Sequence, residues 1–173
     1  MPTGLKQTSS PVAIGFSATE TAPNTFQQSQ IDLNLSPLDR EVFVVLSVNL
    51  NVTRPDGIAG TDTSASAALT TTSQAASGAV PDLSNSNVLA RIDSVITSAG
   101  YVDAGVGFTN SSAETPATNL DYIGIIATND FFVQVQGFQN TGVKRATGKM
   151  YGYRAVASAD IYAALVQSEV LSA

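Results

Sequence analysis

Residues 41–53, EVFVVLSVNLNVT, give the clearest indication of the fold class, because apolar side chains recur in them at every second position. Such a period is typical of a β-strand that has one face in a core. The opposite face begins with Phe43 and Val45 and becomes polar from Ser47 onward. The residues that the pattern predicts on a single core face are Val42, Val44, Leu46, Val48, Leu50 and Val52.

Further strand patterns lie on both sides of this stretch. Residues 31–35 alternate before residues 36–39, which are predicted to form a turn or a single helical turn with Pro37 at its first position. The other predicted strands are residues 12–20, 65–71, 102–109, 120–127, 131–138 and 149–157, and residues 85–98 fit a helix or a strand and are interpreted as a strand. Residues 128–130 have the length of a hairpin connection.

Turn-rich loops separate these strands at residues 54–63, 73–86 and 110–119. Short strands at this spacing predict an all-β fold, an antiparallel sandwich of about eight strands that is jelly-roll-like. We expect one domain over residues 1–173. It consists of an N-terminal arm at 1–11, the sandwich at 12–157, and a C-terminal helix and tail at 158–173.

The C-terminus has a helical pattern. Ser158 is a suitable N-cap, and Asp160 lies in the first turn, where the helix dipole favours a negative charge. The apolar stripe of the helix predicted at 159–170 is Ile161, Tyr162, Leu165 and Val166. A helix this short is not stable alone in water, so the stripe must be buried against the sandwich or against a neighbouring subunit.

The composition argues against catalysis. The chain contains no cysteine and no histidine, which removes thiolate chemistry, disulfides and the commonest general base and metal ligand. Asp32, Asp39 and Glu41 are interpreted as turn and strand-start residues rather than a carboxylate pair. Residues 54–57, RPDG, are read as a turn rather than a calcium loop. We therefore predict no enzyme activity and no cofactor.

The charge distribution is uneven. Charged residues are only 13% of the chain and the net charge is −6, which argues against direct binding to nucleic acid. Four of the eight basic residues nevertheless lie close together, at Lys144, Arg145, Lys149 and Arg154. Because the rest of the chain is acidic, we expect these residues, with the stripe of the C-terminal helix, to contact adjacent subunits. A patch facing nucleic acid or acidic lipid is the alternative.

Two tyrosines, Tyr151 and Tyr153, share a face of the last predicted strand. They fit half-buried core or interface positions better than a platform for stacking sugars. Residues 1–10 contain no apolar run and do not resemble a signal peptide. Residues 42–52, the longest apolar-rich stretch, are too short and too polar to span a membrane. We expect no membrane insertion.

The predicted sandwich, the strand containing YGYR at residues 151–154 and the terminal SADIYAALVQSEVLSA at 158–173 together resemble small single jelly-roll capsid proteins of tailless icosahedral viruses of bacteria or archaea. The resemblance implies a virion subunit that assembles with copies of itself and with other capsid proteins. Residues 1–24 contain one basic residue, Lys6, where many genome-packing capsid proteins have a basic arm. A shell over an internal viral membrane, or an outer protein, fits better than direct genome binding.

Two alternatives stay open at this level. Another phage structural part, such as a head-decoration, fibre or tail-tube subunit, has the same composition and differs in symmetry. A carbohydrate-binding β-sandwich module is the other alternative, with Tyr151, Tyr153 and the long loops as its site.

Overall fold

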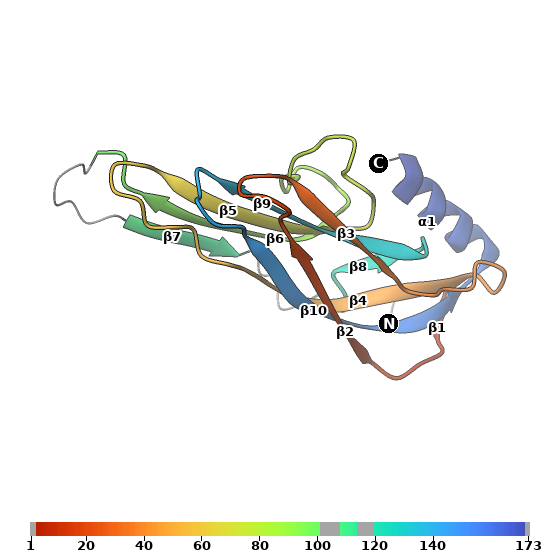
Figure 1. Ribbon diagram of the computed structural model, residues 1–173. Helices are drawn as coiled ribbons and strands as arrows, with labels where there is room; N and C mark the ends of the chain where they lie inside the picture. Colours follow the sequence, from red (N-terminus) through yellow and green to blue (C-terminus); the bar gives the residue numbers. More distant parts are fainter. Residues whose placement is uncertain (1–2, 101–107, 114–119, 172–173) are drawn as a thin grey trace.

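The structure is a computed structural model that describes residues 3–100, 108–113 and 120–171. Its strands are β1 (Leu5–Gln7), β2 (Val12–Thr19), β3 (Gln27–Asp32), β4 (Glu41–Val52), β5 (Thr63–Thr70), β6 (Val88–Thr97), β7 (Phe108–Ala113), β8 (Gly124–Ile126), β9 (Asp130–Phe138) and β10 (Arg145–Ala157). One helix, α1 (Ala159–Leu171), follows the last strand (Figure 1).

The strands form two antiparallel sheets. Sheet A has the order β1-β10-β4-β8, with β2 paired to the same strand as β1, and sheet B has the order β3-β9-β5-β6-β7. Apart from β1 and β7, the order is that of an eight-stranded jelly roll, in which successive strands cross repeatedly between the sheets. The predicted all-β, antiparallel, jelly-roll-like sandwich with a C-terminal helix is confirmed.

Two local predictions change, and a third lies mostly outside the described residues. Residues 128–130 are not a hairpin, because β8 pairs with β4 in sheet A and β9 pairs with β3 and β5 in sheet B. A turn sequence sets a change of direction, but not which sheet accepts the next strand. Residues 110–113 belong to β7 rather than to a loop. Most of the strand predicted at 102–109, namely 102–107, lies outside the described residues.

The main core lies between the sheets. Phe16 of β2 and Phe131 of β9 meet there edge to face, with ring centroids 5.8 Å apart. Around them pack Phe43, Val45, Met150 and other apolar side chains of both sheets. The core holds the two sheets together and leaves their outer faces for other contacts.

A β-bulge in β4 overturns the prediction of one continuous core face. Tyr151 pairs with Ser47 and Gly152 pairs with Val45, so Leu46 is an extra residue without a direct partner. Before the bulge the odd-numbered Phe43 and Val45 face the inter-sheet core, and after it the even-numbered Val48, Leu50 and Val52 do so. Val42 and Val44 instead face outward from sheet A.

A second core covers that outward face at one end of sheet A. Val42, Val44 and Ala155 pack there with Leu5 of β1 and with the helix stripe. The stripe consists of Ile161, Tyr162, Leu165 and Val166. The stripe was predicted to pack either on its own sandwich or on a neighbouring subunit, and it packs on its own sandwich. Part of the predicted N-terminal arm, Leu5–Gln7, is a strand of the same sheet.

Glu169 anchors the far end of α1. Its carboxylate accepts hydrogen bonds from the backbone N–H groups of Ala127 and Thr128 at 3.0 and 3.1 Å, and from the Thr128 hydroxyl at 2.9 Å. Burial raises the pKa of Glu169 above its ordinary value, although these hydrogen bonds oppose the shift. The helix is thus tied to the connection between the two sheets.

Candidate functional site

The predicted basic cluster does not form one patch. Lys144 is buried, with 3% of its side chain exposed, and its Nζ donates to Asp56 Oδ1 at 2.6 Å and to the Arg54 carbonyl at 3.1 Å. The hydrogen bond from Lys144 holds the pKa of Asp56 well below its ordinary value, aided by the backbone N–H of Gly142. Lys144 is therefore a structural cation, and its place in an intersubunit patch is corrected.

Arg154 is also engaged within the subunit. Its guanidinium forms an ion pair with Glu41 at 3.2 Å and donates to the backbone carbonyls of Leu33 and Asn34. These bonds join β10 to the segment between β3 and β4. Asp39, within this segment, accepts a hydrogen bond from the Ser36 hydroxyl at 2.7 Å. Both carboxylates have the structural roles that their positions in the sequence suggested.

Arg145 and Lys149 lie on the exposed half of the outer face of sheet A. Strand register places Lys149 between Gly15 of β2 and Asn49 of β4, and Thr147 between neutral neighbours in the next row. The other outward residues of this half are Ala13, Ser17, Thr19, Ser47, Asn51 and Tyr151. Apart from Arg145 and Lys149, all these outward residues are uncharged. We call the whole set the neutral face; its remaining members are Thr147, Gly15 and Asn49.

The two tyrosines of β10 have different environments. Tyr153 is 7% exposed and packs in the core beneath α1, while Tyr151 is half-buried at the edge of the neutral face. They share a strand face, as predicted, but the helix covers one of them. The pair therefore does not present two rings to a sugar.

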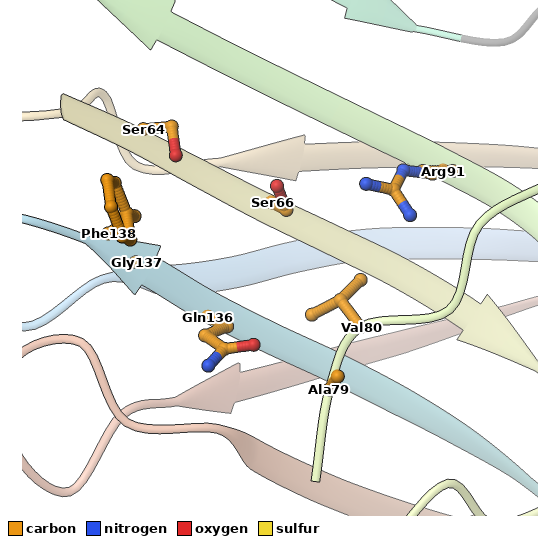
Figure 2. Close-up of a pocket in the computed structure, with 8 residues that line it drawn as sticks. All are labelled: Ser64, Ser66, Ala79, Val80, Arg91, Gln136, Gly137 and Phe138. Atoms are coloured by element: carbon orange, nitrogen blue, oxygen red, sulfur yellow. The ribbon is translucent and has the colours of Figure 1, made fainter. Parts of the chain in front are cut away.

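A shallow pocket lies on the outer face of sheet B, and none of the candidate site residues predicted from the sequence lines it (Figure 2). Its volume is about 330 Å³. The floor is made by Ser64 and Ser66 of β5, and Gln136 and Phe138 of β9 lie directly opposite them in register. Gly137 of β9, Ala79 and Val80 of the β5–β6 connection and Arg91 of β6 complete the lining.

An ion pair organises one side of this pocket. Arg91 Nε donates to Asp93 Oδ2 at 2.7 Å and Nη2 donates to Oδ1 at 2.9 Å, while Nη1 donates to the Pro81 carbonyl. The Ser66 hydroxyl also donates to Asp93. Burial opposes ionisation of Asp93, but these hydrogen bonds outweigh it and hold the pKa of Asp93 below its ordinary value. The charges of Arg91 and Asp93 compensate each other.

The loop that walls the pocket is held onto sheet B by further hydrogen bonds. Gln28 accepts from the backbone N–H of Gln74 at 2.7 Å, and its amide donates to the Ser73 hydroxyl at 2.8 Å. Sequence reasoning missed this pocket because each polar residue has the spacing of an ordinary solvent-facing strand position. The one indication in the sequence was Phe138, an aromatic residue that follows Gln134 and Gln136 on the polar face of its strand, and the structure leaves it 58% exposed.

No group of three or more metal-ligating side chains occurs among the described residues. Within the same ranges, no helix has the length and apolar character needed to cross a membrane. Comparison with protein-family models, curated proteins and solved structures finds no match for this chain. The site and the strand order therefore carry the functional argument.

Proposed function

We propose that this protein is a structural subunit that assembles with copies of itself, and that the assembly is a virus capsid. The observation that carries the proposal is the jelly-roll strand order, in which β2, β10, β4 and β8 of sheet A face β3, β9, β5 and β6 of sheet B. Viral capsid proteins are a major class that uses this architecture, and lectins are another. Other capsid proteins are the expected additional partners, in a virion.

The neutral face supports contact between copies. Neutral dipoles lose less hydration energy than ions when they are buried, so an amide- and hydroxyl-rich surface suits repeated contact with neighbours. The two exposed cations of this face, Arg145 and Lys149, belong to a chain with net charge −6. A second copy supplies acidic surface that orients the pair, while buried apolar and neutral area supplies most of the affinity.

Assembly is tested by negative-stain electron microscopy and light scattering of concentrated protein over a range of salt. We expect closed shells or discrete capsomers. An R145E/K149E variant should assemble more weakly, with the largest difference at low salt. Lys6→Glu is the matched control, because Lys6 is an exposed cation on β1 outside the neutral face. A monomer at every concentration and salt tested contradicts the proposal.

The same experiment separates the runner-up within the same class. A head-decoration, fibre or tail-tube subunit forms rings, tubes or small symmetric oligomers rather than closed shells. If such particles form, the protein is still a structural subunit, but its assembly is not a capsid shell.

A further inference from the structure

We propose that the pocket on the outer face of sheet B, lined by Ser64, Ser66, Arg91, Gln136 and Phe138, binds an uncharged saccharide. This binding function is separate from self-assembly, since the pocket and the neutral face lie on different sheets. It is also a different site from the tyrosine pair of β10.

The aromatic end of the pocket suits the C–H face of a sugar ring. Phe138 is 58% exposed, although it lies on a regular strand whose neighbouring outward residues are polar. An exposed aromatic side chain is costly to keep in water unless another surface covers it. Ser64 pairs directly with Phe138 and leaves open space beside the ring, because its side chain is small.

The polar part of the pocket suits hydroxyl groups. Among the described residues, the side-chain amide of Gln136 has no hydrogen-bond partner, so both its donors and its acceptor face a ligand or water. Ser66 lies directly across from Gln136, and its hydroxyl oxygen still accepts after donating to Asp93. Ser64 and Ser66 are two residues apart, about 7 Å along the strand, so their hydroxyls line the same face of the pocket.

The electrostatics select an uncharged ligand. Three of the five N–H donors of Arg91 are taken by Asp93 and Pro81, which leaves two for a ligand without leaving a net positive charge. An anion such as a phosphate binds most strongly to a guanidinium that has no other counter-charge. Here Asp93 already compensates the charge of Arg91, so an anion gains little binding energy. A wholly apolar ligand would leave the guanidinium, the amide and the hydroxyls without partners. A saccharide satisfies both the ring and the polar groups.

The test screens the full-length protein against immobilised neutral oligosaccharides of glucose, galactose, mannose and N-acetylglucosamine, with sialylated and sulfated glycans as charged counterparts. Hits are measured in solution by saturation-transfer NMR, which works for free and assembled protein. We expect binding of neutral glycans, and a loss of affinity of about tenfold or more in Phe138→Ala and in Gln136→Ala. Both side chains are on the surface, so both variants should fold.

The matched controls are Leu38→Ala, an apolar residue that is 95% exposed at the β3–β4 corner, and Gln167→Ala on the exposed side of α1. Neither should change binding. No binding to any neutral glycan, stronger binding to the charged set, or equal binding by wild type and both pocket variants overturns the inference. If Phe138→Ala changes particle formation and no glycan binds, the pocket is covered by a second copy instead, which also overturns it. If the pocket variants lose glycan binding but form particles of the same morphology as wild type, glycan binding is independent of assembly. That result separates this inference from the proposed function.

Discussion

Lys144 Nζ donates a hydrogen bond to Asp56 Oδ1 across 2.6 Å, in a setting where 3% of the lysine side chain and 30% of the aspartate side chain are exposed. Asp56 also accepts from the backbone N–H groups of Thr141 and Gly142. The pair therefore ties the β4–β5 connection to the turn that precedes β10. An interaction predicted between subunits instead stabilises the fold of one subunit.

Lys144→Ala should lower the free energy of unfolding by about 3 kcal/mol, because removing one member of a buried pair leaves the other without its counter-charge. Partial exposure of Asp56 keeps the cost at the low end of the range for such pairs. Lys149→Ala, which removes an exposed cation of β10, should change the free energy of unfolding by less than about 0.5 kcal/mol. Urea unfolding followed by circular dichroism measures both. Equal effects would contradict the structural role of Lys144.

Asp56 should also contribute an acid-sensitive part of the stability. Because Lys144 lowers the pKa of Asp56 in the folded state, the unfolded chain binds the proton more tightly. The contribution is present above the unfolded pKa of about 4 and is lost as the pH falls toward the folded pKa. Comparing unfolding of wild type and Asp56→Asn between pH 3 and pH 7 should show a difference that shrinks on acidification. A constant difference would exclude this linkage.

Glu169 should show the opposite pH dependence. Burial raises its pKa in the folded state, so the folded protein binds the proton more tightly than the unfolded chain does. The contribution of the protonated carboxyl is complete below the unfolded pKa of about 4.3 and is lost as the pH rises through the folded pKa. Glu169→Gln, which cannot ionise, should remove this slope in thermal unfolding above pH 4. If the pH dependence of stability is the same in the variant, it comes from another titrating group.

Gly152→Ala should destabilise sheet A by about 3 kcal/mol or more, since a Cβ there collides with the Val44 carbonyl and the Phe43 ring. The space is closed because Gly152 lies against β4 next to the bulge. Gly15→Ala is the control: it lies on β2 of the same sheet and a Cβ there meets nothing within 4 Å. Its effect should be neutral or stabilising by up to about 1 kcal/mol. Thermal unfolding measures both variants. A large loss in Gly152→Ala alone indicates a packing clash, whereas equal losses would mean that sheet A tolerates no alanine at either glycine.

The candidate sites differ in how far the sequence reveals them. The apolar stripe of α1 was readable because Ile161, Tyr162, Leu165 and Val166 repeat locally at the helical period. The pocket of sheet B was not, because its lining comes from β5, β6, β9 and a connection between strands. Ser64 and Gln136 become neighbours of the site only through strand pairing between residues far apart in the chain.

Most local conformations of this protein follow from the order of its residues, although residues 110–113 belong to β7 and not to the predicted loop. Alternating apolar side chains make residues 41–53 a strand, turn-forming residues end the strands, and Ser158 with the stripe that follows starts a helix. These outcomes depend on neighbours within a few positions, so the order of residues is enough to specify them.

Which faces are buried and which charges are paired depends on how distant segments pack together. The extra residue Leu46 reverses the two faces of β4, a shift that appears only when the strand is set against β10. Lys144, just before β10, is buried because the β4–β5 connection brings Asp56 to it, while Lys149 on β10 points to solvent. Burial and pairing depend on contacts between distant segments, and the free energy of those contacts is set by the packed fold rather than by local pattern.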